Sequence, residues 1–236
     1  MQQLLTGKKR LPGFGEGQGY KESVIGLIPE DWDLETIESV VPMGRKYGIV
    51  DGPFGSNLKS IHYKTFGTPI ISSGYVTEGR FFADDYLYVD EEKFRQERRS
   101  AVSGGDIVMA KIGARCGAST ILPKNHQIGI LSGNALKISV DESKHSTYFI
   151  WQILWSHYLE GNLDQVTVVG VQPAVSMANL KKYKIALPQR EEQQAIATVL
   201  SDMDNEIAAL ESRLAKTQAI KQGMMQELLT GRTRLI

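Results

Sequence analysis

The sequence is almost free of cysteine. Its 236 residues include one, Cys116, so the fold cannot depend on disulfides within the chain, and this usage fits a reducing compartment. We interpret Cys116 as a small buried apolar side chain rather than as a reactive thiol. Long hydrophobic runs are also absent, because charges or glycine interrupt each one well short of a membrane span, and the first eight residues contain no apolar secretory core. We therefore expect a soluble, cytoplasmic protein without membrane contact.

Net charge is absent too. The chain has 27 Lys and Arg residues against 27 Asp and Glu residues, which argues against binding to nucleic acid by overall attraction alone. The distribution is uneven, since residues 36–187 contain 17 basic and 14 acidic residues, whereas residues 188–236 contain 6 and 7. The middle of the chain is therefore mildly basic, which is a weak indication of a contact face for phosphates.

Motifs for catalysis are missing. The sequence has neither the Asn/Asp-Pro-Pro-aromatic tetrad nor the glycine-rich loop after a strand that base methylation would require, and it has no Walker motif. Nothing local indicates a catalytic triad. The histidines show no metal-ligand spacing; they are His62, His126, His145 and His157. We predict a non-enzymatic chain with no metal or cofactor of its own.

The two ends of the chain repeat each other. Residues 1–11 read MQQLLTGKKRL, and residues 225–235 read MQELLTGRTRL. A chain that ends on the motif with which it begins resembles one unit of a tandem array, and such a unit depends on a neighbour to bury its apolar face. We therefore expect a partner.

Composition divides the chain into residues 1–14, 15–188 and 189–236. The first part would be the end of a preceding helix, Met1–Leu5 closed by Thr6-Gly7, and the start of a linker. The linker, Lys8–Gly19, is rich in glycine, but no strand precedes it and its spacing matches no phosphate-binding motif. We interpret it as a flexible connector.

The middle part has the pattern of a mixed α/β (α+β) domain. Apolar residues at helical spacing between Ser146 and Leu159 predict a buried helix. A compact turn is expected at Asp51-Gly-Pro-Phe-Gly-Ser56. Short strands bounded by Gly, Pro, Asn or Ser are predicted over Thr68–Ser72, Asp106–Ile112, Ala118–Leu122, Ile128–Leu131 and Ala135–Val140.

The last part predicts one helix from about Arg190 to Leu229, which would be about 60 Å long at 1.5 Å per residue. Its mainly apolar seam repeats with alternating spacings of four and three, the pattern of a helix that pairs in a coiled coil. An exposed stripe of this kind needs a cover, so we predict a dimerisation seam; the alternative is that the helix packs entirely on its own domain. The apolar seam positions are Ile196, Leu200, Met203, Ile207, Leu210, Leu214, Met224 and Leu228.

Five segments of the chain are informative in combination: Asp51–Ser56, residues 105–113 (GDIVMAKIG), Gln172-Pro173, residues 187–204 (LPQREEQQAIATVLSDMD) and residues 221–231 (KQGMMQELLTG). Together and in this order they resemble the DNA-specificity subunit of type I restriction-modification enzymes, and the resemblance spans essentially the whole chain. The resemblance implies a target-recognition domain, here residues 15–188, carried on a long helix. It also implies a non-catalytic reader of DNA sequence within a methyltransferase and nuclease assembly.

A typical member of that family has two recognition domains and two antiparallel helices, whereas this chain has one domain, one helix and the tail of another. We therefore expect a half-subunit that forms a homodimer through the helix. Two-fold symmetry then predicts a target of two short inverted half-sites, with centres about one helical turn, roughly 34 Å, apart.

Candidate DNA contacts are polar and basic residues in the turn-rich stretches, which are able to reach phosphates and groove edges. The alternative for each of them is an ordinary solvated loop residue. The candidates are Ser56, Asn57, Lys59, His62, Tyr63, Lys64, Tyr75, Arg80, Lys111 and Arg115.

The expected partners are double-stranded DNA, a second copy, and the modification subunit, with a restriction subunit as a further candidate. By the resemblance, S-adenosylmethionine and ATP belong to those partner subunits. Two other hypotheses stay open. One is an adaptor that docks methyltransferase subunits without DNA specificity of its own, and the other is a self-sufficient enzyme with unrecognised motifs.

Overall fold

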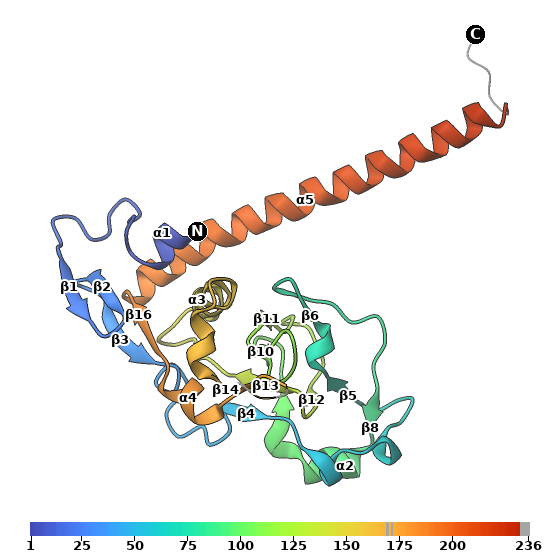
Figure 1. Cartoon of the computed structure of the whole chain (residues 1–236), viewed down its shortest axis with the longest axis horizontal. Coiled ribbons are helices and arrows are strands. Elements are labelled where there is room, and N and C mark those ends of the chain that lie inside the picture. The colour runs from blue at the N-terminus through green and yellow to red at the C-terminus, as the bar shows by residue number, and fades with distance from the viewer. Residues whose placement is uncertain (169, 171, 232–236) are drawn as a thin grey trace.

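The protein consists of a head and a rod. The structure is a computed structural model that describes residues 1–168, 170 and 172–231, apart from the side chains of Ser56 and Thr77. Short strands and helices form the head, and the long helix α5 (Arg190–Leu229) leaves it as the rod (Figure 1). The expected α/β (α+β) class is confirmed.

One four-stranded sheet lies at the centre of the head. Its order is β11-β10-β13-β4, and each neighbouring pair is antiparallel. The strands predicted over residues 106–112, 118–122 and 135–140 are confirmed in it, each somewhat shorter than expected. The strands are β4 (Ile49–Asp51), β10 (Ile107–Ala110), β11 (Ser119–Ile121) and β13 (Ala135–Ile138).

A second four-stranded sheet has the order β8-β5-β12-β9 and shares one apolar cluster with the first. Its central pair, β5 and β12, is parallel, and both strands were predicted from the sequence. The strands are β5 (Thr68–Ile71), β8 (Tyr88–Val89), β9 (Ala101–Val102) and β12 (Gly129–Leu131).

Smaller elements complete the head. Antiparallel pairs are β1 (Tyr20–Ser23) with β2 (Gly26–Pro29), β3 (Asp33–Thr36) with β16 (Lys184–Leu187), β6 (Val76–Thr77) with β7 (Arg80–Phe81), and β14 (Thr167–Val168) with β15 (Ala174–Val175). The α-helices besides α5 are α1 (Gln2–Leu5), α2 (Glu91–Gln96), α3 (Thr147–Leu159) and α4 (Met177–Lys182). Single 3-10 turns are η1 (Gly55–Asn57), η2 (Ser60–His62), η3 (Ser73–Tyr75), η4 (Arg98–Ser100) and η5 (Asn162–Val166).

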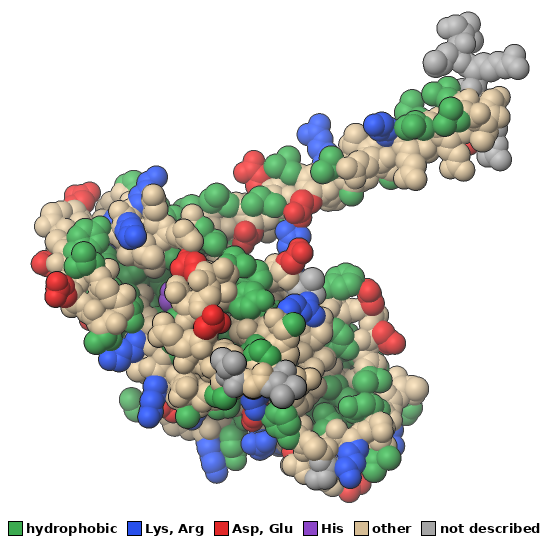
Figure 2. All heavy atoms as spheres, viewed as in Figure 1, with side chains coloured by type: hydrophobic (Ala, Val, Ile, Leu, Met, Phe, Trp, Pro, Cys, Tyr) green, Lys and Arg blue, Asp and Glu red, His purple; other side chains and the backbone are tan. Residues whose placement is uncertain are grey.

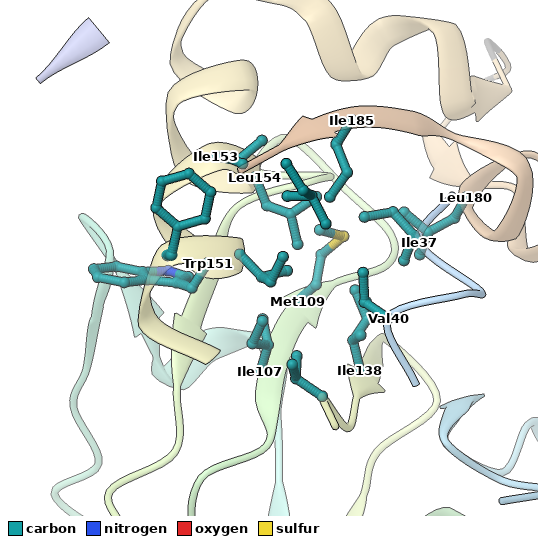
Figure 3. Packing of buried hydrophobic residues seen from close by; sticks show 14 of the residues in the cluster. Ile37, Val40, Ile107, Met109, Ile138, Trp151, Ile153, Leu154, Leu180 and Ile185 are labelled. Atoms are coloured by element: carbon teal, nitrogen blue, oxygen red, sulfur yellow. The ribbon is translucent and has the colours of Figure 1, made fainter. Parts of the chain in front are cut away.

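Strand β10 separates the two layers of the core. Because side chains alternate along a strand, Ile107 and Met109 face one cluster, whereas Val108 and Ala110 face another. All four residues are buried, which explains why the strand reads as a continuous apolar run. The first cluster lies against α3, and Figure 3 shows its side chains turned toward one another. Those labelled are Ile37, Val40, Ile107, Met109, Ile138, Trp151, Ile153, Leu154, Leu180 and Ile185.

Helix α3 confirms the helix expected between Ser146 and Leu159. The Ser146 side chain caps its first turn by accepting a hydrogen bond from the Phe149 N–H group at 3.4 Å. The helix is buried on almost every side over its first turns, because it lies between the central sheet and the start of α5.

The rod confirms the predicted long helix, with 40 residues. Its first turns are part of the head, since Glu192, Gln193, Ile196, Ala197 and Leu200 are buried. Residues 202–231 are all exposed, and Figure 2 shows the outer part of the rod standing clear of the head. The alternative in which the helix packs entirely on its own domain is therefore wrong.

Two positions of the predicted dimerisation seam need correction. Ile196 is fully buried and Leu200 is 3% exposed, and both belong to the core beside α3. They share the periodicity of the seam because they continue one helix face, but the head covers that face at its base. The seam open to a partner therefore begins at Met203. Its exposed apolar members are Met203, Ile207, Leu210, Leu214, Met224 and Leu228.

Helix α1 confirms the helical stub predicted at the amino terminus. It ends at Leu5, which is 6% exposed, and Gly7 follows in the left-handed conformation with φ at 68°. A left-handed glycine just past a helix end is a common way to terminate a helix.

The segment after α1 has no helix or strand as far as Gly19, as expected, but the interpretation as a flexible connector is wrong at Arg10. Arg10 Nη2 lies 2.7 Å from Asp31 Oδ2, and Arg10 Nε lies 2.6 Å from Glu192 Oε1. The Arg10 side chain is 14% exposed, and its hydrogen bonds hold the pKa of the Asp31 carboxyl below its usual range. The segment is thus fixed to the first turn of α5.

The buried start of the rod makes a prediction about stability. Leu200→Ala should lower the free energy of unfolding by about 2–5 kcal/mol, because it removes apolar contacts from the core. Leu159→Ala, at a position that is 60% exposed, is the matched control and should change it by less than about 0.5 kcal/mol. Urea unfolding followed by circular dichroism measures both. Equal effects of the two substitutions would contradict the buried anchor.

Candidate nucleic-acid interface

The predicted turn after β4 is held by a close approach of two backbones. A Cβ atom on Gly52 would lie 2.0 Å from the Ser132 carbonyl oxygen, and one on Gly133 would lie 2.9 Å from the Pro53 carbonyl oxygen. Only glycine allows this packing. The loop before β13 therefore sets the direction in which the chain leaves β4, and it directs residues 54–66 away from the sheet. We call residues 54–66 the distal loop.

Lys111 fastens the start of the distal loop. Its Nζ atom pairs with Asp51 Oδ2 at 2.5 Å and lies 4.1 Å from the centre of the Phe54 ring. The Lys111 side chain is 13% exposed. Its charge is paired with Asp51 inside the turn, so Lys111 supports the loop, and a DNA contact by Lys111 stays a prediction.

Four of the predicted DNA contacts lie exposed on the distal loop: Asn57, Lys59, Tyr63 and Lys64. Lys64 Nζ is 3.9 Å from Asp90 Oδ2, a pair in which both side chains are about half exposed and which therefore contributes little to stability. Within the part of the chain that the structure describes, Lys59 forms no ion pair.

The two other predicted residues of the distal loop differ from these four. His62 is half-buried, and its Nδ1 atom accepts a hydrogen bond from the Lys59 N–H group at 3.0 Å, which closes the turn η2. Ser56 lies in η1, but its side chain is outside the described set. His62 thus shapes the loop locally.

The sequence reasoning missed two large apolar residues on the distal loop. Ile61 is 75% exposed and Phe66 is 81% exposed. Two large exposed apolar side chains in one loop beside Lys59 and Lys64 indicate a contact surface, because grouped exposed apolar side chains often mark an interaction site. The available signal was their position as apolar residues inside a turn-rich polar segment.

Tyr75 supports the neighbouring loop. Its hydroxyl donates a hydrogen bond to the Asp85 carbonyl at 2.7 Å, and its ring meets the rings of Phe81 and Tyr86 edge to face. Burial raises the pKa of its hydroxyl. Tyr75 therefore fixes residues 77–85, and the structure places it in an aromatic cluster rather than on an open contact surface.

Arg80 and Arg115 belong to another part of the head. Arg80 Nη1 lies 2.9 Å from Glu211 Oε2 on the rod, and Arg115 Nη1 donates to the Val76 carbonyl at 2.9 Å. Both arginines are exposed. In Figure 1, β6 lies beneath the rod, whereas β8, to which Lys64 is bridged, lies at the far end of the head. The structure thus divides the predicted DNA contacts into two groups instead of bringing them together.

Three further ionisable side chains, His157, Tyr183 and Cys116, are partly buried in the head. Tyr183 and His157 share a hydrogen bond of 3.0 Å, and burial lowers the pKa of His157 and raises that of Tyr183 to about 12. Burial also raises the pKa of the half-buried Cys116 thiol. Among the described residues, no group of three or more His, Cys, Asp and Glu side chains could hold a metal ion. No helix in that part of the chain is long and apolar enough to span a membrane.

Comparison with known proteins identifies the family. Residues 29–222 match the family model described as the type I restriction modification DNA specificity domain. The chain belongs to this family. A relative of the specificity domain is the type I restriction enzyme MjaVIII specificity subunit of Methanocaldococcus jannaschii, which is 27% identical over 227 residues. That match covers 94% of this chain and 51% of the relative.

Solved structures share the fold of this specificity domain. A chain from a study of complex assembly and conformational transition of the type I R-M system is 18% identical, with a TM-score of 0.60 over 84% of this chain and 45% of that one. The type I S subunit from M. genitalium is 16% identical, with a TM-score of 0.56 over 83% of this chain and 45% of that one. The chain thus spans about half the length of the relatives that it matches.

The different surroundings of two lysines make a prediction. Lys111→Ala should lower the free energy of unfolding by about 1–3 kcal/mol, because it removes the partly buried partner of Asp51 and leaves only Arg99, at 4.0 Å, beside that carboxylate. Lys59→Ala, at an exposed position on the distal loop, should change it by less than about 0.5 kcal/mol. Urea unfolding of the two variants measures the difference. A Lys111→Ala protein as stable as the wild-type chain would contradict the supporting role of Lys111.

Proposed function

We propose that this chain is the DNA-reading subunit of a type I restriction-modification system and that it acts in the cytoplasm. The observation that carries the proposal is the surface of the distal loop. In this chain, which belongs to the specificity family, the loop exposes Lys59 and Lys64 together with Ile61, Tyr63 and Phe66. Lysines that reach phosphates set the position of a protein on DNA, while polar and apolar groups contact base edges.

The distal loop is the primary contact surface in this proposal, with Arg80 and Arg115 as a second group nearer the rod. The pair between Arg80 and Glu211 is more than half exposed on both sides, so it costs little to break when a phosphate replaces the carboxylate. Residues 15–188 are the recognition domain in this scheme, residues 189–236 are the spacing helix, and residues 1–14 are the end of a preceding helix with its linker.

The rod couples two copies in the proposal. Its open seam from Met203 to Leu228 has the four-and-three spacing of a coiled coil, and the exposure of its apolar members, from 38% to 60%, is unfavourable in water. Antiparallel pairing of two rods covers the seam and places one head at each end. The two heads then read an inverted repeat with an unread spacer.

In this scheme, partner chains catalyse the methylation and cleavage reactions. The specificity dimer recruits the modification subunit, which carries S-adenosylmethionine, and a restriction subunit, which carries ATP, is a further partner. This chain recognises the target sequence on the DNA and has no catalytic residues, cofactor or metal of its own.

Replacing the exposed lysines tests the reading surface. In complex with the modification subunit, Lys59→Ala and Lys64→Ala should each weaken binding to all DNA sequences, and each should lower the slope of log affinity against log salt by about 1. Arg95→Ala on α2, where the guanidinium pairs with Glu91, is the control and should leave the slope unchanged. Gel shifts over a salt series measure the effect. A complex with no more sequence preference than the modification subunit alone would favour the adaptor hypothesis.

Sedimentation tests the dimer. The wild-type chain should sediment as a dimer at micromolar concentration, and Leu210→Asp should shift it to monomer, because the charge would be buried in the paired seam. Lys216→Asp, which introduces an acid on the same rod outside the seam, is the matched control and should stay dimeric. A wild-type chain found only as monomer would contradict the proposal.

A further inference from the structure

The two copies of the terminal repeat end their helices in the same way. The Thr6 hydroxyl donates to the Gln2 carbonyl at 2.8 Å, and the Thr230 hydroxyl donates to the Gln226 carbonyl at 2.7 Å. The Thr6 and Thr230 N–H groups donate to the Gln2 and Gln226 carbonyls at 3.0 and 3.1 Å, and the Gly7 and Gly231 N–H groups donate to the Leu4 and Leu228 carbonyls at 3.3 and 3.2 Å. Each glycine is left-handed, with φ of 68° in one copy and 71° in the other. Residues 1–7 and 225–231 therefore form the same structural unit twice.

The first copy is docked at the base of the rod. Leu5 is buried in the core, and Leu4 and Leu11 pack against it. A Cβ atom on Gly7 would lie 2.4 Å from the Pro29 ring, so the backbone of the repeat touches the head directly.

Arg10 completes the docked copy. It lies 5.6 Å from the centre of the Trp32 ring and pairs with Asp31 and Glu192. The site that receives the first copy is thus apolar at one end and doubly acidic at the other. We call it the basal site, formed by Pro29, Asp31, Trp32, Glu192 and the adjoining core.

The positions at which the two copies differ are those that the basal site does not touch. The repeat differs at Gln3, Lys8 and Lys9, which correspond to Glu227, Arg232 and Thr233. All three side chains of the first copy are exposed. Each residue with a docking role is identical in the second copy: Leu4, Leu5, Gly7, Arg10 and Leu11 correspond to Leu228, Leu229, Gly231, Arg234 and Leu235.

The described residues of the second copy, 225–231, lie at the far end of the rod and are all exposed. Leu229 is 82% exposed and Leu228 is 38% exposed, whereas Leu5 is 6% exposed and Leu4 is partly buried. Arg234 and Leu235 lie outside the described residues, so they are matched to Arg10 and Leu11 by sequence alone. The second copy thus carries the residues of a docking segment with nothing of its own chain covering the described ones.

We propose that the basal site binds the carboxy-terminal repeat, residues 225–235, of a second copy in place of the chain's own amino-terminal repeat. The inference deepens the proposed dimer and rests on it for its biological setting, because antiparallel rods bring the end of one rod to the base of the other. The Arg234 guanidinium then pairs with Asp31 and Glu192, and Leu229 fills the place of Leu5.

The two occupants compete. The amino-terminal repeat is tethered beside the basal site and so has a high effective concentration there, of order mM for a short linker. A free carboxy-terminal repeat should therefore bind weakly to the wild-type chain and strongly once the first copy is weakened. If the partner's carboxy-terminal repeat replaces the amino-terminal repeat in the basal site, α1 must leave that site before the rods pair fully.

Peptide binding tests the proposal without relying on the dimer. The probe is a fluorescein-labelled peptide of residues 221–236. The receptor is the full chain carrying Leu210→Asp, to keep the rods apart, and Leu229→Asp, to silence its own second copy. Adding Leu5→Asp or Arg10→Ala should tighten peptide binding at least about tenfold in fluorescence anisotropy, whereas the matched change Lys9→Ala should leave it as weak as in the starting receptor.

Variants of the probe identify the site. Arg234→Ala in the peptide should weaken binding about tenfold or more, and Thr233→Ala should not. If neither Leu5→Asp nor Arg10→Ala receptors fold alone, excess peptide should restore cooperative thermal unfolding by supplying the missing repeat. Equal binding to all receptors, an inert Arg234→Ala change, or failure to restore unfolding would each overturn the proposal. Because the rods are kept apart, such a result would leave the sedimentation test of the dimer untouched.

Discussion

The structure depends on burial of the first turns of α5 in the head. Ile196 and Leu200 lie in the core beside α3. Gln193 ties the helix to the loop before α3 by accepting from the Ser146 N–H group, and it donates to the Pro188 carbonyl between β16 and α5. Arg10 joins Glu192 to the amino-terminal segment. A helix held by both apolar contacts and hydrogen bonds at its base cannot swivel freely, so the direction of the outer rod relative to the head is set there.

In the proposed function, that fixed base sets the direction in which the head of this neutral chain faces relative to the rod. The head carries its exposed cations and apolar side chains on the distal loop, and the loop is itself braced by the Lys111 pair with Asp51 and by the contact between Gly52 and Ser132. The rod adds reach instead of affinity. In the proposed dimer, a second copy covers the exposed seam, and two weak DNA-contact surfaces on one rigid frame bind better than either alone.

Sequence reasoning recovered what local patterns determine. The Gly, Pro, Asn and Ser residues that flank each strand located β5, β10, β11, β12 and β13, and the four-and-three spacing located the rod. The sequence did not predict burial or ion pairing where these depend on contacts between distant segments. Ile196 and Leu210 have the same place in the seam pattern, and only the folded head shows that one is buried. Lys59 and Lys111 both lie in turn-rich segments, but the partner of Lys111 is 60 residues away in the chain. Arg10 looked like part of a flexible linker because its two acidic partners lie 21 and 182 residues away.

The central claim is that the rod is a rigid spacer between two identical heads. Selecting duplexes from random DNA, with the modification subunit present, tests it most directly when the wild-type chain is compared with a chain that lacks residues 207–213. Removal of these seven residues keeps the seam in phase and shortens each rod by about 10 Å at 1.5 Å per residue. We predict an inverted repeat for the wild-type chain, and the same half-sites about three base pairs closer together for the shortened chain. An asymmetric site, or an unchanged spacer after the deletion, would contradict the account.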